Sequence, residues 1–167
     1  MKNVKKHCYI GRISHEKGIK TLIAAANRLP HKLVIIGKGP LDAEMKKLAG
    51  PNVEFAGFKQ WNEIKRIVGQ ARFCVIPSEC YENNPLSVIE SQCLGTPVLG
   101  AQIGGIPELI QEGCNGLHFR SRDTDDLTAK IQAMYDAPFD YPSIALEAKK
   151  RYNSETYYKQ LIQLYNL

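Results

Sequence analysis

The chain has 167 residues, which suffices for one α/β domain of ordinary size and is too short for two. With 44% hydrophobic and 23% charged residues, its composition is that of a globular protein and excludes a disordered tail. No apolar run approaches the roughly 18–20 residues that cross a bilayer, and the basic start MKNVKKHCYIG lacks the apolar stretch of a secretory signal. We therefore expect a cytoplasmic protein.

The net charge of +5 is concentrated at the start of the chain. Residues 1–20 hold six of the 22 Lys and Arg and one of the 17 Asp and Glu, which leaves 16 charges of each sign in the rest. Nucleic-acid binders usually carry a basic stripe through the fold. We therefore expect no nucleic-acid partner, and we interpret the basic start as a solvated segment beside an anion site. Peripheral association of the parent protein with the inner face of a membrane stays open.

The cysteine pattern gives no sign of a metal site or a disulfide framework. The five cysteines are an odd number and include no C-x-x-C pair. Histidines likewise show no zinc-ligand spacing. We interpret the cysteines as reduced, small hydrophobic residues.

Short β-rich runs alternate with helical patterns along the chain. The expected strands are His7–Ile13, Lys32–Gly37, Asn52–Ala56, Arg72–Ile76, Pro97–Ala101 and Gly116–Phe119. The expected helices between and after them are Gly18–Leu29, Leu41–Ala49, Trp61–Gly69, Pro85–Leu94, Ile106–Ile110 and Thr124–Tyr135. Strands such as LVIIG are almost continuously apolar, as in sheets with helices on both faces. The pattern predicts a doubly wound parallel sheet of Rossmann-like type.

The end of the chain predicts two further helices, Ile144–Arg151 and Glu155–Tyr165, the second with Ser154 as its cap. Earlier in the chain, Pro85 suits the first turn of a helix that Asn84 caps. We divide the chain into a Rossmann-like domain, residues 1–136, and terminal helices, residues 137–167. Those helices are expected either to pack on that domain or to strap it to another.

Candidate ligand-binding residues follow the first expected strands, because ligands of open α/β sheets bind at the carboxyl ends of the strands. Arg12 and Lys17 come after the first strand, and Lys17 stands at the start of the next helix. Two cations and a helix N-terminus suit a diphosphate. Two solvated surface cations explain this loop equally well.

The loop Gly37-Lys38-Gly39-Pro40 follows the second strand. It matches neither G-x-G-x-x-G nor the P-loop pattern, which argues against a dehydrogenase and a P-loop enzyme. A close approach of its backbone to a ligand stays open.

The richest cluster is PSECYENNPLSVIESQC, in which Glu82 and Glu90 are eight residues apart. A carboxylate accepts two hydrogen bonds from a sugar diol, and Asn83 and Asn84 are suited to an anion or a sugar hydroxyl. Glu pairs at this spacing are common, so the spacing alone favours a structural role. After the fifth strand, Gly104-Gly105 offers bare backbone to a ligand. Asp123-Thr124-Asp125 spells D-x-D, which we interpret as an acidic helix start.

Together these loops resemble the C-terminal, donor-binding domain of the GT-B retaining glycosyltransferases, in particular glycosyltransferase family 4. The resemblance runs from about Cys8 to Tyr135. Its motifs, in order, are G-R-x-x-x-E-K-G (Gly11 to Gly18), VIIGKGP, PNVEFAGF, Glu-x7-Glu (Glu82 to Glu90), G-T-P-V (Gly95 to Val98) and G-G-x-x-E (Gly104 to Glu108).

The resemblance implies a hexosyltransferase that uses a nucleoside-diphosphate sugar and no bound metal or other cofactor. In it, Arg12 and Lys17 hold the diphosphate and stabilise it as leaving group, while Glu82 meets the donor sugar and Glu90 the ribose. It counts Glu82, Arg12 and Lys17 as catalytic. The other implied donor-binding residues are Gly11, Gly37, Gly39, Gly57, Phe58, Lys59, Asn83, Asn84, Pro85 and Leu86.

Two departures from the family pattern stand out. Asn83-Asn84-Pro85 replaces a Gly-Phe-Gly-like run, which affects the contacts to the sugar. Residue 11 already lies in the first loop of the donor domain, so the N-terminal acceptor-binding domain is an expected partner, and this fragment alone should bind donor and transfer little. The parent would act in surface polysaccharide synthesis. Open alternatives are half of a nucleotide-sugar epimerase and a stand-alone nucleotide-sugar or polyanion binding module.

Overall fold

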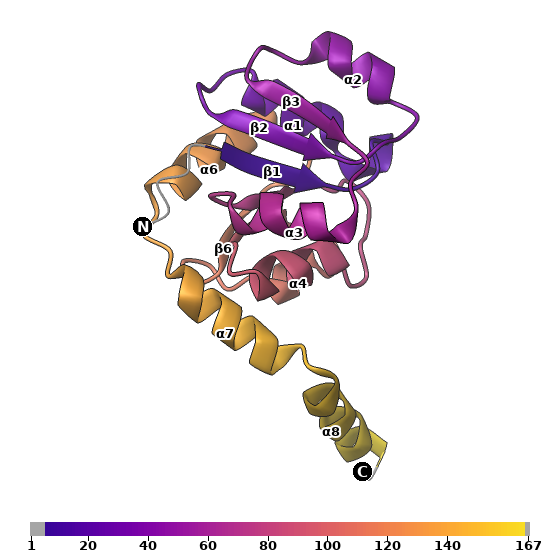
Figure 1. Cartoon of the computed structure of the whole chain (residues 1–167), viewed down its shortest axis with the longest axis vertical. Coiled ribbons are helices and arrows are strands. Elements are labelled where there is room, and N and C mark those ends of the chain that lie inside the picture. The colour runs from indigo at the N-terminus through magenta and orange to yellow at the C-terminus, as the bar shows by residue number, and fades with distance from the viewer. Residues whose placement is uncertain (1–5, 166–167) are drawn as a thin grey trace.

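Six parallel strands form a single sheet in the order β3-β2-β1-β4-β5-β6 (Figure 1). The computed structural model describes residues 6–165. The strands are β1 (Lys6–Ile10), β2 (Lys32–Ile36), β3 (Val53–Gly57), β4 (Cys74–Ile76), β5 (Val98–Ala101) and β6 (Gly116–Phe119). All six were predicted from their apolar runs, with ends that differ by a few residues. Chain order reverses between β1 and β4, which creates the crevice where such folds bind ligands.

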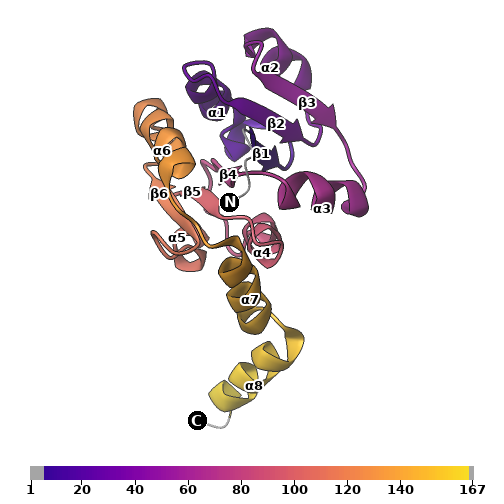
Figure 2. The same ribbon diagram turned by 60° about the vertical axis from the view of Figure 1, so that its left-hand side comes forward.

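Helices cover both faces of the sheet, which confirms the doubly wound architecture (Figure 2). One face packs against α1 (Ile19–Ala26), α2 (Asp42–Leu48) and α6 (Thr124–Asp136), and the other against α3 (Trp61–Gly69), α4 (Leu86–Cys93) and α5 (Ile106–Leu109). Buried side chains form one cluster on each side of the sheet. Leu22 and Ile131 belong to the first cluster, and Val68 and Val88 to the second. Apolar residues on both faces explain why the strands lack polar alternation.

The first strand ends at Ile10, three residues earlier than predicted. The backbone of Gly11 and Ile13 still donates to the carbonyl oxygens of Ile36 and Lys38, at 3.0 and 3.1 Å, but the chain then leaves the sheet plane. It enters a short 3₁₀ helix, η1 (His15–Lys17), which the sequence pattern did not predict. Gly18 follows in a left-handed conformation (φ 66°) and begins α1.

Five helix starts differ from the predicted ones: α1 and α2 begin one residue later than predicted, and the starts of α4, α7 and α8 are shifted for reasons that the structure shows. Pro85 has an extended ψ of 105°, so α4 begins at Leu86 and Asn84 does not cap it. The helix α7 (Tyr141–Arg151) begins three residues earlier than predicted, because the Asp140 carboxylate accepts from the Ser143 amide at 3.2 Å. In α8 (Ser154–Tyr165) the cap is Asn153, whose Oδ1 accepts from the Thr156 amide at 2.7 Å.

The terminal helices α7 and α8 extend from the sheet domain one after the other (Figure 1). Helix α7 packs against α4 and buries Tyr141, Ile144 and Ala148, while α8 contacts α7. The Tyr141 hydroxyl also donates to the carbonyl oxygen of Arg72 at 3.1 Å. These contacts tie α7 to the sheet domain; the functional boundary near residue 136 stays a prediction.

No helix in residues 6–165 is long and apolar enough to cross a membrane. Five free cysteines are present: Cys8 and Cys74 are fully buried as core residues, whereas Cys114 is exposed.

A buried histidine makes the stability of this fold depend on pH. His7 of β1 is fully buried, stacks on Phe73 at 5.0 Å between ring centroids, and shares a 3.0 Å hydrogen bond through Nδ1 with the Tyr135 hydroxyl. Its Nε2 atom is buried without a protein partner. Burial, assisted by the charge of His31, lowers the pKa of His7 from 6.5 to about 3. The folded state therefore keeps His7 neutral where the unfolded chain takes up a proton.

We expect the fold to lose stability as pH falls below about 6.5, where the unfolded state binds a proton that the folded state rejects. The cost attributable to His7 is about 2 kcal/mol at pH 5. The free energy of unfolding should decrease between pH 7 and pH 5 in both chains, and this decrease should be smaller in His7→Phe than in the wild type by about this amount. Urea denaturation at pH 5, 6 and 7 measures it, and an unchanged pH slope in the variant would contradict a neutral buried His7.

Truncation tests which terminal helix stabilises the domain. A chain that stops after Asp136 loses α7 and exposes the α4 surface beneath Ile144 and Tyr141, so its free energy of unfolding should fall by at least about 3 kcal/mol. A chain that stops after Asn153 should have a free energy of unfolding within about 1 kcal/mol of that of the full chain. The loss is small because α8 contacts the end of the structure formed by α7. Thermal and urea denaturation of the three chains compare them. Equal losses from both truncations would show that α8 is the stabilising helix.

Candidate functional site

A pocket of about 390 Å³ lies at the carboxyl ends of β1 and β4, where the strand order reverses. This is the position at which open α/β sheets bind ligands. Its lining residues are Tyr9, Ile10, Gly11, Arg12, Lys17, Ile76, Ser78, Glu82, Asn84, Pro85, Leu86 and Ser87. The structure thus brings together seven predicted site residues from two loops that are 65 residues apart in sequence.

The loop after β1 is fixed by contacts with its own strand and with the loop after β4. The Tyr9 hydroxyl donates to the Arg12 carbonyl oxygen at 2.7 Å, and the Glu79 amide donates to the Glu16 carbonyl oxygen at 2.9 Å. A Cβ on Gly18 would lie 1.8 Å from the Pro77 carbonyl oxygen. Only glycine permits this approach, which seats Lys17 beside the loop after β4.

The Lys17 ammonium forms an ion pair with Glu82, and the Ser78 hydroxyl donates to the same carboxylate oxygen, Oε1, at 2.8 Å. Burial by itself raises the pKa of Glu82. The hydrogen bonds from Lys17 and Ser78 oppose this effect, and the resulting pKa lies below the usual glutamate range. Glu82 is therefore an anion at neutral pH, placed as a hydrogen-bond acceptor within the pocket.

The glycine pair after β5 supports the Glu82 loop. A Cβ on Gly105 would lie 2.1 Å from the carbonyl oxygen of Asn83, and the Gly105 amide donates to the carbonyl oxygen of Glu82 at 2.7 Å. Gly104 likewise packs on the Glu82 backbone. The neighbouring loop thus fills the space where side chains at these two positions would lie, and a ligand contact with their backbone stays a prediction.

A second pocket of about 240 Å³ adjoins the first. It is lined by Ile10, Gly11, Arg12, Ile36, Gly37, Lys38, Phe58, Lys59 and Ile64. Ile10, Gly11 and Arg12 line both pockets, so the two lie side by side and share a wall. Phe58 exposes 67% of its surface there, and two lysines lie in the same wall. An aromatic ring beside cations suits a flat, anionic ligand such as a nucleotide.

The glycines of the Gly37-Lys38-Gly39 loop serve mainly to join loops. A Cβ on Gly37 would lie 1.9 Å from the Gly11 carbonyl oxygen, and one on Gly39 would lie 2.2 Å from that of Ile13. Gly39 lines neither pocket, and neither does Gly57, whose carbonyl oxygen accepts from the Gly37 amide at 2.9 Å. Neighbouring loops thus approach both glycines closely, while Gly37 also lines the second pocket, so the approach of a ligand to this loop stays a prediction.

Glu90 lies on α4 one turn beyond Leu86 and Ser87, so it shares their face of the helix. It is half-buried and lines neither pocket, and burial raises its pKa. The carboxylate has no hydrogen-bond partner among residues 6–165. Asn83, by contrast, is exposed and lies outside both pockets.

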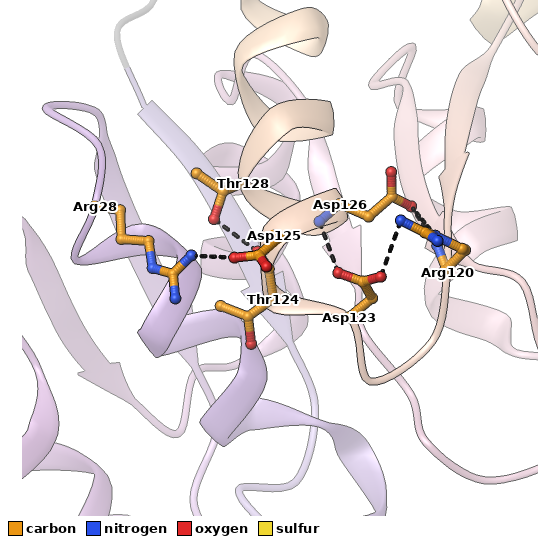
Figure 3. Close-up of polar contacts among 7 residues, drawn as sticks. All are labelled: Arg28, Arg120, Asp123, Thr124, Asp125, Asp126 and Thr128. Carbon is orange, nitrogen blue, oxygen red and sulfur yellow. Dashed lines mark hydrogen bonds and ion pairs between the residues drawn. The ribbon is translucent and has the colours of Figure 1, made fainter.

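The D-x-D sequence starts a helix, as predicted (Figure 3). The Asp123 carboxylate caps α6 by accepting from the Asp126 amide at 2.8 Å, and it pairs with Arg120 at 3.0 Å. Asp125 pairs with Arg28 of the turn after α1 at 2.5 Å. The carboxylates are thus used in capping and ion pairs. Across the described residues, no three His, Cys, Asp or Glu side chains group as metal ligands.

Four polar lining residues were not predicted as site residues: Tyr9, Lys38, Ser78 and Ser87. Ser78 follows β4 by two residues, and that position at a strand end was the available signal. Lys38 lies between two glycines of the predicted loop, and a lysine in an exposed loop is usually a solvated surface residue. Nothing in the sequence indicated that Tyr9 lines a site, since a tyrosine in a strand usually belongs to the core.

Comparison with known proteins identifies the family. Residues 2–159 match the model of the family described as "Glycosyl transferases group 1". The sulfoquinovosyl transferase of Arabidopsis thaliana is 34% identical over 131 residues, which are 75% of this chain and 26% of that protein. The glycogen synthase of Mycobacterium tuberculosis is 30% identical over 157 residues, which are 88% of this chain and 38% of that protein.

Solved structures agree on the fold. HepE of Anabaena in complex with UDP superposes with a TM-score of 0.84 at 21% identity, covering 99% of this chain and 50% of that chain; HepE is also known with UDP-glucose. This chain spans half or less of the length of these relatives, and its sheet domain is one half of a GT-B fold. Since the family model covers nearly the whole sequence, the chain belongs to the group 1 glycosyl transferases.

Proposed function

We propose that this chain is the donor-binding half of a retaining, metal-independent glycosyltransferase. The whole protein transfers a hexose from a nucleoside-diphosphate sugar to a glycan or lipid-linked acceptor, in the synthesis of a surface polysaccharide. We place it in the cytoplasm, and peripheral association with the inner face of the membrane stays open. The family resemblance supports the stereochemistry and the independence from metal.

The observation that carries the proposal is the pair of adjoining pockets that share Arg12 as a lining residue. On one side are the Lys17 ammonium and the Glu82 carboxylate; on the other are Phe58 and Lys59. A nucleoside-diphosphate sugar has the matching order of a polar ring, a doubly charged diphosphate, and an aromatic base. The UDP bound in the structurally similar HepE supports the same class of ligand.

In this proposal Arg12 and Lys17 bind the diphosphate and offset the negative charge that grows on it as the glycosidic bond breaks. Fixed cations are effective here because their orientation is set before the reaction. The Arg12 guanidinium makes no ion pair with residues 6–165, so it is available to an anion. Glu82 accepts a hydroxyl of the donor sugar, and Asn84, Pro85 and Leu86 border the same pocket.

The base lies against the segment Gly57–Lys59, and the ribose hydroxyls reach Glu90. A half-buried carboxylate without a hydrogen-bond partner in the protein is stabilised by a ligand that donates hydrogen bonds to it. The acceptor site belongs to the N-terminal domain of the GT-B architecture. The chain alone therefore binds donor and transfers sugar slowly or not at all.

Calorimetric titration with UDP, GDP and ADP tests the donor site and identifies the base. We expect one nucleotide to bind in the micromolar-to-millimolar range, with the same affinity with and without magnesium. Arg12→Ala and Lys17→Ala should each weaken binding about tenfold or more, because each removes a charge-assisted hydrogen bond. Arg28→Ala is the matched control, since it removes an exposed arginine far from the site, paired with Asp125.

Binding that ignores the base and collapses with added salt would indicate a polyanion surface instead. Absence of binding by any nucleotide at millimolar concentration would contradict a donor site in this chain.

A double-mutant cycle tests the assignment of Glu90 to the ribose. UDP should bind more tightly than 2′-deoxy-UDP to the wild-type chain, by about fivefold, because the 2′-hydroxyl donates to the carboxylate. In Glu90→Gln this preference should shrink towards equality, while the exposed control Glu147→Gln keeps it. A preference that survives in Glu90→Gln would place the ribose elsewhere. If another base is selected, its own deoxy analogue replaces 2′-deoxy-UDP.

A further inference from the structure

All hydrogen bonds that the described residues make to the Glu82 side chain end on one oxygen. Lys17 Nζ and Ser78 Oγ both donate to Oε1, and the Cys80 sulfur lies 4.0 Å from the same atom. The second oxygen, Oε2, accepts nothing within residues 6–165. The carboxylate is thus anchored through one oxygen and keeps the other for a ligand.

The two main donors differ in how firmly they are held. Ser78 is 2% exposed and sits directly after β4, and its carbonyl oxygen accepts from the Ser121 hydroxyl at 3.1 Å. The Lys17 side chain is 30% exposed and lines the pocket, so an anion can reach it. A bound diphosphate therefore competes with Glu82 for the lysine, whereas the serine stays in place.

We propose that Ser78 is a positioning residue, whose hydroxyl keeps Glu82 Oε1 anchored when a diphosphate draws Lys17 away. Oε2 then stays directed at the donor sugar and accepts one of its hydroxyls. This inference rests on the proposed function, and it adds a residue that the family resemblance did not assign.

The charges around Glu82 explain why an anchor is needed. Glu16 is a second anion nearby, Tyr9 is buried and neutral, and Lys17 is the neighbouring cation. A diphosphate in the pocket repels the Glu82 carboxylate. Once Lys17 is shared with that diphosphate, the neutral Ser78 hydroxyl is the donor that still opposes rotation of Glu82 out of the site.

The first arm of the test uses no ligand. Carbon-13 NMR titration of the glutamate carboxyls, assigned with Glu82→Gln, gives the pKa of Glu82. We expect Ser78→Ala to raise this pKa, because the anion loses a hydrogen bond, and Ser78→Thr to restore it. Ser91→Ala is the matched control: it removes a fully buried serine hydroxyl that donates instead to the Ser87 carbonyl oxygen at 2.7 Å. The control should leave the pKa of Glu82 at its wild-type value.

The second arm compares UDP with UDP-glucose by calorimetry. In Ser78→Ala the advantage of UDP-glucose over UDP should fall about fivefold, the worth of one hydrogen bond, and Ser78→Thr should recover it. A merely structural defect would weaken both ligands alike and lower the melting temperature. Circular dichroism of each variant monitors that alternative.

An unchanged pKa of Glu82 in Ser78→Ala would overturn the anchoring, whatever the chain binds. A raised pKa with an unaltered ratio of the two affinities would overturn the role toward the sugar. If the wild-type chain binds neither UDP nor UDP-glucose, the proposed function itself is contradicted, and the inference about Ser78 fails with it. This outcome is distinguishable because it is seen in the wild-type chain, before any variant is measured.

Discussion

Close backbone approach between three loops holds the site together, and it is possible only where a Cβ is absent. A Cβ on Gly18 would lie 1.8 Å from the Pro77 carbonyl oxygen, and one on Gly105 would lie 2.1 Å from that of Asn83. These contacts seat the loops after β1 and β5 on the loop after β4, which carries Glu82. The ion pair between Lys17 and Glu82 depends on this loop packing, because the two residues lie in loops that are far apart in the sequence.

The electrostatics of the site follow from the same arrangement. Lys17 is neutralised by Glu82, whereas the Arg12 guanidinium has no ion pair with residues 6–165. In the proposed function, an incoming diphosphate meets a free cation first and shares the second one with a carboxylate. On the same proposal Ser78 keeps its hydrogen bond to Glu82 while the lysine is shared, which limits the cost of binding. The pocket is preorganised through a carboxylate as much as through its cations.

Sequence patterns predicted the sheet well because each strand is an apolar run buried on both faces. Helix α3 was predicted with its observed ends, which agrees with Gln60 and Glu63 forming a capping box, the Gln60 amide donating to Glu63 at 3.2 Å. The start of α4 was wrong because ψ at Pro85 depends on how the preceding loop is folded. Ser78 could not be recognised, since a serine after a strand is common and its direction is set by tertiary contacts.

The glycines show where sequence reasoning about the site reached its limit. A glycine at a strand end indicates that something approaches the backbone closely, but it does not reveal whether that is a ligand or a neighbouring loop. At Gly37, Gly39 and Gly105 it is a loop. The family motifs therefore combine two kinds of constraint, since their glycines bring the loops together and three of their charged residues, Arg12, Lys17 and Glu82, line the pocket. A change in a motif glycine acts on the fold first, whereas a change in Arg12 acts, in the proposed function, on the ligand directly.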